Sequence, residues 1–212
     1  ISLFVVLITI SSLLEIDENK SRIKNKLKKS DVYNKSFYQV PNDLENEKGR
    51  NLSLDWANKI SKGGYILYFR HAEREKWNDV QMYDALESDS YQNSQNGKLY
   101  GENTYFAKAV CLNSRGKVQV KGMREVVKYS NLPVGYIVSS PSCRARQTAE
   151  GVFGRYDKLD KILVHKGPYT ENIGERNKKL KTFFLSLPIE NGKNTIVSAH
   201  NGVIDNSLFA NV

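Results

Sequence analysis

The sequence predicts an α/β fold, a three-layer sandwich with a mainly parallel central sheet. The first observation is a set of short apolar segments in which polar and apolar residues do not alternate, at 65–69 (YILYF), 136–140 (YIVSS) and 195–199 (TIVSA). A strand that helices cover on both faces of a parallel sheet has this character. The second observation is that helical patterns separate these segments. Strands that alternate with helices favour parallel pairing through right-handed crossovers.

The helical patterns carry start and stop signals. Ser53 is a possible N-cap of the first helix, which Gly63-Gly64 would end, and Ser114 is a possible cap of the second. The patterns lie at 51–64, 113–130, 144–154 and 177–187. The segment 162–164 (ILV) is a weaker candidate for a fourth strand.

Composition divides the chain into three parts. Residues 1–14 are apolar apart from Ser and Thr, which predicts a truncated signal peptide or membrane anchor, with a buried strand or helix of the folded domain as the alternative. Residues 15–50 are polar, without apolar periodicity, and indicate a tether. Residues 51–212 form the folded domain of the prediction.

Positive charge favours an anionic partner. The chain of 212 residues has 32 Lys and Arg against 23 Asp and Glu, a net charge of +9. We expect no nucleic-acid partner, because no regular pattern of aromatic and basic residues is present, and no metal site, because no Cys and His cluster has zinc spacing. The basic cluster at 20–29 allows membrane contact through residues 1–29.

The polar stretch 74–110 interrupts the alternation of strands and helices. It contains several aromatic residues and is too long for an ordinary connection in a compact domain. An active-site cover and a variable surface insertion are both open interpretations.

Histidines and arginines follow the three strong strands. Arg70 and His71 come directly after the first strand, Arg144 follows the second, and His200 follows the third. Ligands of open α/β sheets sit outside the carboxyl ends of the strands, so these side chains should meet at one edge. Guanidinium groups bind phosphate oxygens, and a neutral imidazole can attack phosphorus. The sequence therefore predicts a phosphoryl site.

Four motifs in order along the chain carry a family resemblance. RHAE at 70–73, LNSRGKVQ at 112–119, SSPSCRARQTAE at 139–150 and VSAHNGV at 197–203 resemble the motifs of the histidine phosphatase superfamily, also called phosphoglycerate mutase-like, and of its exported bacterial branch. The resemblance extends from about residue 52 to 205. It implies a phosphoglycerate mutase-like fold and a phosphomonoester hydrolase that works through phosphohistidine without a metal or other cofactor. It also implies that the domain is incomplete at its C-terminal end.

The resemblance assigns roles residue by residue. His71 resembles the nucleophile, Arg70 and Arg144 the phosphate-binding arginines, and His200 the second pocket histidine. GPYTENIGE at 167–175 resembles the stretch with the proton donor, which implies Glu171. Glu73, close to the nucleophile, is the alternative donor and otherwise a substrate-binding residue. The implied substrate is a small phosphoester or a phosphoprotein.

Other interpretations of the same pocket stay open. A phosphotransferase or mutase would pass the phosphoryl group to another hydroxyl, and a non-catalytic protein would only bind a phosphorylated ligand. An exported or membrane-anchored protein, periplasmic or extracellular, would allow Cys111 and Cys143 to form a disulfide. A cytoplasmic location is the alternative, with two buried thiols. We expect His165 to be structural, and Arg146 to lie on its helix surface or to pair locally.

Overall fold

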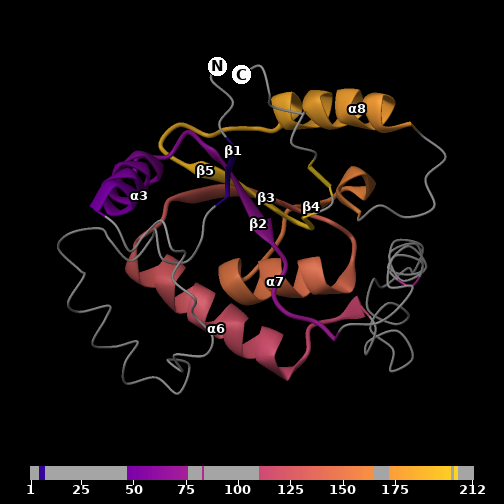
Figure 1. The fold of residues 1–212 in the computed structure, drawn as a ribbon, viewed down its shortest axis with the longest axis horizontal. Helices are drawn as coiled ribbons and strands as arrows, with labels where there is room; N and C mark the ends of the chain where they lie inside the picture. Colours follow the sequence, from indigo (N-terminus) through magenta and orange to yellow (C-terminus); the bar gives the residue numbers. More distant parts are fainter. Residues whose placement is uncertain are drawn as a thin grey trace.

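The computed structural model (Figure 1) describes residues 5–7, 47–75, 83, 110–164, 172–201 and 203–204. These residues form an α/β fold in which every strand pair of the sheet is parallel. The strand order in the described part is β1-β2-β5-β3-β4. The prediction of an α/β protein with a parallel sheet is therefore confirmed.

The elements have the following bounds. The strands are β1 (Val5–Leu7), β2 (Ile66–Arg70), β3 (Val134–Ser139), β4 (Lys158–Leu159) and β5 (Asn194–Ala199). The α-helices are α3 (Glu47–Ile60), α6 (Ser114–Tyr129), α7 (Cys143–Phe153) and α8 (Ile173–Ser186), and Lys161–Leu163 form the 3-10 helix η4.

The three predicted strong strands are the centre of the sheet. In β5 every residue is buried, between β2 and β3. The register aligns Arg70 of β2 with Ala199 of β5, and Ser139 of β3 with Ser198 of β5. The carboxyl ends of the three strands therefore coincide at one edge of the sheet.

Helices cover both faces of the sheet (Figure 1). Leu67 and Phe69 point to one face, where they pack in one cluster with residues of α6 and α7. Ile66 and Tyr68 point to the other face and pack with Leu180 and Phe184 of α8. Both sets of side chains on β2 meet apolar partners, which explains why this strand shows no polar alternation.

Two helix starts differ from the expected ones. The cap of α6 is Asn113, whose side-chain oxygen accepts from the Gly116 amide at 2.7 Å, and Ser114 is the first helical residue. The helix α3 begins at Glu47, so Ser53 lies within it and is not its cap. The cap predicted at Ser114 was wrong because the side chain of the preceding Asn113 reaches the exposed amide, and the cap predicted at Ser53 was wrong because the helix already begins at Glu47.

The predicted strand at 162–164 is also wrong. Residues Lys161–Leu163 form the 3-10 helix η4, since the Asp160 carboxylate accepts from the Ile162 amide at 3.2 Å. A local side-chain bond of this kind competes with a sheet ladder. The short strand β4 precedes it and pairs with Val138 and Ser139.

Part of the N-terminal region belongs to the sheet. Val5–Leu7 form β1, which pairs in parallel with β2. The remainder of residues 1–14 and most of the expected tether lie outside the described residues, and the signal peptide or anchor stays a prediction. Among the helices that the structure describes, none has the length and apolar character needed to span a membrane.

Candidate active site

A cavity of about 370 Å³ lies where β2 and β5 end. Its lining brings together Arg70, His71, Glu73, Arg144 and His200, five of the six side chains predicted for the site. The sixth, Glu171, lies outside the described residues. Among the residues that the structure describes, Ala72, Arg74, Gln119 and Asn201 also line the cavity.

A short contact with the backbone orients the ring of His71. Its Nδ1 lies 2.7 Å from the carbonyl oxygen of Ala72. A carbonyl oxygen only accepts, so Nδ1 carries the proton and Nε2 keeps its lone pair. The His71 amide also donates to the Ala199 carbonyl at 3.0 Å, which ties the residue to the end of β5. The neutral ring is thus prepared to act as a nucleophile through Nε2.

The surroundings of His71 oppose its protonation. Burial is the largest cause, the Arg144 guanidinium is the next, and Arg70 and Arg74 add to it. Together they lower the pKa of His71 from 6.5 to about 2, although the bond to Ala72 acts in the opposite direction. The imidazole is therefore uncharged near neutral pH.

His200 lies next to His71 and is fully buried. The centroids of the His71 and His200 rings are 5.1 Å apart. Its Nε2 lies 3.1 Å from the Ser140 hydroxyl oxygen, on the loop between β3 and α7. The Tyr68 hydroxyl contacts the His200 backbone from β2. A strand residue, Tyr68 of β2, and a loop residue, Ser140, therefore hold the second histidine.

Arg144 is a buried cation at the start of α7. Its side chain lines the cavity, and the residue is 1% exposed. Its carbonyl accepts from the Thr148 hydroxyl at 2.7 Å, and the Thr148 oxygen accepts from the Ala72 amide at 3.0 Å. A guanidinium removed from water interacts strongly with an anion that enters the same cavity. Arg70, in contrast, is exposed at the end of β2.

Glu73 lies in the cavity wall with its carboxylate held by donors. Its two oxygens accept from the side-chain amides of Asn113 at 3.3 Å and Gln119 at 3.5 Å, and Arg115 lies 3.5 Å away. A side chain at Gly116 would place its Cβ 2.1 Å from the Glu73 carbonyl oxygen. Glycine at 116 lets α6 approach this loop. These donors fix the position of the Glu73 carboxylate in the cavity wall.

The sequence interpretation assigned no catalytic or binding role to three residues around the site. Gln119 lies in the motif LNSRGKVQ, where it follows Asn113 and Gly116 at helical spacing, and this spacing was the available signal. Arg74 adjoins RHAE, and Ser140 lies within SSPSCRARQTAE. Local sequence gives no sign that Ser140 contacts a histidine 60 positions away.

The structure tests one other assignment, that of Arg146. Arg146 is buried and not on the helix surface, which corrects one of the two expectations. Its guanidinium donates to the Pro141 carbonyl, in agreement with the expectation of local pairing. It is absent from the cavity lining. His165 lies outside the described residues.

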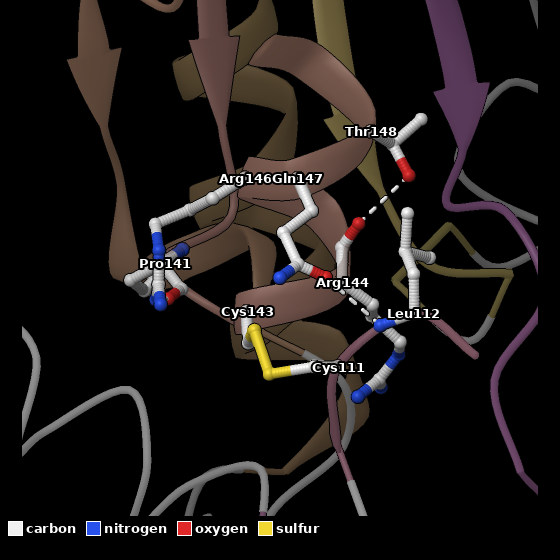
Figure 2. Close-up of a disulfide and its surroundings, with 8 residues drawn as sticks. All are labelled: Cys111, Leu112, Pro141, Cys143, Arg144, Arg146, Gln147 and Thr148. Carbon is white, nitrogen blue, oxygen red and sulfur yellow. Dashed lines mark hydrogen bonds between the residues drawn. A yellow bond between two sulfur atoms is a disulfide. The ribbon is translucent and has the colours of Figure 1, made fainter. Parts of the chain in front are cut away.

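The two cysteines form a disulfide beside Arg144 (Figure 2). The Cα atoms of Cys111 and Cys143 are 4.9 Å apart, and both residues are buried. The neighbouring Leu112 amide donates to the Gln147 side chain at 2.9 Å, which is a second link to α7. The expected bridge is present, and it fastens the segment before α6 to the first turn of α7.

Comparisons add no family assignment. No model of a known protein family matches the chain, and no curated protein matches it. Within the described ranges, no three or more His, Cys, Asp and Glu side chains gather as a candidate metal site. The geometry and the sequence motifs therefore carry the functional argument.

Replacement of both cysteines by serine should destabilise the protein. The bridge closes a loop with a sequence separation of 32, for which the loss of unfolded-chain entropy corresponds to about 3–4 kcal/mol. Urea unfolding of the oxidised protein and of the Cys111→Ser/Cys143→Ser variant measures the difference. Thiol titration in denaturant without reductant is the control, and two free thiols there would contradict the bridge.

The low pKa of His71 predicts a pH-dependent loss of stability. As pH falls below 6.5, the unfolded chain protonates this histidine, while the folded protein does not until about pH 2. The unfolded state then binds more protons, so the free energy of unfolding falls, by at most about 1.4 kcal/mol per pH unit. His71→Gln removes this contribution. Unfolding curves between pH 7 and pH 4 should show the smaller decline for the variant, and equal declines would contradict the neutral ring.

Proposed function

We propose that the chain is a phosphomonoester hydrolase that works through a phosphohistidine at His71. In this proposal the fold is phosphoglycerate mutase-like, and the chain is a member of the histidine phosphatase superfamily that its four motifs resemble. The observation that carries the proposal is the cavity in which the rings of His71 and His200 lie 5.1 Å apart beside the Arg144 guanidinium. A neutral imidazole and a buried cation are what phosphoryl transfer to nitrogen requires.

The first step forms a bond between His71 Nε2 and phosphorus. Arg144 and Arg70 bind the phosphoryl oxygens, and His200 donates to them as their charge increases in the transition state. The bond from phosphorus to the ester oxygen breaks, and that oxygen takes a proton from a carboxylic acid. The family resemblance supports Glu171 as this acid. Glu73 is less suited to the role, because its carboxylate already accepts hydrogen bonds from Asn113 and Gln119.

In the second step, water attacks the phosphohistidine. The bond from phosphorus to Nε2 breaks, inorganic phosphate leaves, and the electron pair returns to the imidazole. The carboxylate that gave its proton in the first step takes one from the attacking water. The hydrogen bond from Nδ1 to the Ala72 carbonyl keeps the ring in one orientation throughout.

The cavity and the disulfide support two further parts of the proposal. A volume of about 370 Å³ suits a small phosphoester or a phosphorylated side chain. The disulfide supports an exported or membrane-anchored protein in an oxidising compartment, with the cytoplasmic alternative less favoured. In this mechanism the arginines supply the positive charge, so the proposed reaction includes no metal.

Replacement of His71 should abolish turnover. We expect His71→Ala to lower kcat for p-nitrophenyl phosphate by about 10³-fold or more, because the attacking atom is lost. Rapid quenching with labelled substrate should trap an acid-labile phosphoenzyme in the unaltered protein and none in the variant.

A matched control keeps the histidine and removes an exposed charge. Arg124→Ala, on the outer side of α6, should keep the activity of the unaltered protein. Full activity of His71→Ala would overturn the proposal. Phosphate binding without turnover would support the binding-protein alternative, and an isomeric phosphoester as the product would support a mutase.

The proton donor can be identified by comparing two substrates whose leaving groups differ in their need for a proton. An alkyl phosphate needs protonation of its leaving oxygen, whereas nitrophenolate leaves without it. We expect Glu171→Gln to lower kcat for glycerol phosphate by about 10²-fold or more, and to lower kcat for p-nitrophenyl phosphate far less. Glu73→Gln should affect both substrates equally, because Glu73 supports the cavity wall. The opposite pattern for the two variants would assign the donor to Glu73.

A further inference from the structure

Tyr68 is a buried tyrosine on β2 that makes two hydrogen bonds to one catalytic residue. Its hydroxyl donates to the His200 carbonyl oxygen at 2.8 Å and accepts from the His200 amide at 3.2 Å. The cavity lining does not include Tyr68. Any effect of this hydroxyl on a bound phosphoryl group must therefore act through His200.

The two bonds occur where the sheet ladder ends. The last residue pair between β2 and β5 is Arg70 with Ala199, and the His71 amide donates to the Ala199 carbonyl. His200 is the next residue and is fully buried, so its peptide groups need partners from outside the ladder. The Tyr68 hydroxyl serves both groups, and the Val203 amide also donates to the carbonyl, at 3.2 Å.

The packing of Tyr68 keeps this hydroxyl in place. The residue is 2% exposed, and its ring lies against Phe184 of α8, with 6.4 Å between the ring centroids. Burial raises the pKa of Tyr68 above its usual value of 10, so the hydroxyl keeps its proton and remains a donor. A rigid side chain with a constant donor and acceptor is suited to fix a backbone position.

The side chain of His200 has a separate support. Its Nε2 contacts the Ser140 hydroxyl at 3.1 Å, from the loop after β3. Tyr68 acts on the backbone from β2, the strand that leads into His71. The backbone of His200 is thus held from β2 and its ring from the loop after β3. The spacing between the His71 and His200 rings depends on both supports.

We propose that Tyr68 is a positioning residue that sets the His200 ring relative to His71 through the peptide groups of His200. This inference rests on the proposed function, in which His200 donates to the phosphoryl oxygens in the transition state. One strand, β2, would then carry the nucleophile and also align the second histidine. We therefore expect loss of the Tyr68 hydroxyl to lower kcat more than it weakens the binding of phosphate.

The test is removal of a single oxygen. Tyr68→Phe keeps the ring and its contact with Phe184. We expect kcat for p-nitrophenyl phosphate to fall by about 10-fold or more, because a small displacement of a catalytic group is costly. The inhibition constant for inorganic phosphate should change by less than about 3-fold, since Arg70 and Arg144 are unaltered. Tyr136→Phe makes the same change on β3, away from His200, and should keep kcat.

A double-mutant cycle separates positioning from general damage to the fold. In a His200→Ala protein there is no ring to position, so Tyr68→Phe should then change kcat by less than about 2-fold. An equal loss in both backgrounds would mean that the hydroxyl acts on structure alone, and this would overturn the inference. Thermal unfolding of each variant gives the temperature below which the assays are made.

A measurement on the unaltered protein covers the case in which Tyr68→Phe does not fold. The Tyr68 hydroxyl proton should give a slowly exchanging NMR signal with a nuclear Overhauser effect to the His200 amide proton. Absence of this signal would overturn the inference. An unaltered protein without turnover or phosphoenzyme would instead overturn the proposed function, whereas normal kcat in Tyr68→Phe would overturn only the role of Tyr68.

Discussion

The parallel pairing of β2 with β5 is the constraint on which the site depends. Its register places Arg70 beside Ala199, so His71 and His200 leave the sheet at the same edge. The His71 amide continues this pairing by one bond to the Ala199 carbonyl. Side chains more than a hundred positions apart in sequence therefore meet because two buried strands end together.

Burial then gives the assembled side chains their chemical character. Arg144 is almost inaccessible to solvent, and together with the loss of water around His71 it keeps that imidazole neutral. The same charge that disfavours a proton on His71 favours a phosphoryl group next to it. The exposed Arg70 contributes less than Arg144 to the low pKa of His71, because water screens its charge.

Polar contacts connect this edge to the first turn of α7 and the start of α6. Ser198 of β5 donates to the Ala145 carbonyl at 2.9 Å, and the Thr148 oxygen accepts from the Ala72 amide. The disulfide of Cys143 reaches the segment before α6 (Figure 2). A buried polar group that loses its hydrogen bond is costly, so these contacts favour a single arrangement of the site.

The sequence by itself determined the central strands, the alternation with helices and four of the basic residues that line the cavity, namely Arg70, His71, Arg144 and His200. These features follow from local properties, namely unbroken apolar runs and motif residues at strand ends. Only the tertiary structure decided the partner of Glu73, the burial of Arg146 and the link from Tyr68 to His200. Each of these depends on which distant amide, carbonyl or helix a side chain meets after the strands have paired, and no local pattern encodes that neighbour. The error at 162–164 has a different cause, because there a local hydrogen bond from the Ile162 amide to the Asp160 carboxylate outweighed an apolar run typical of a strand.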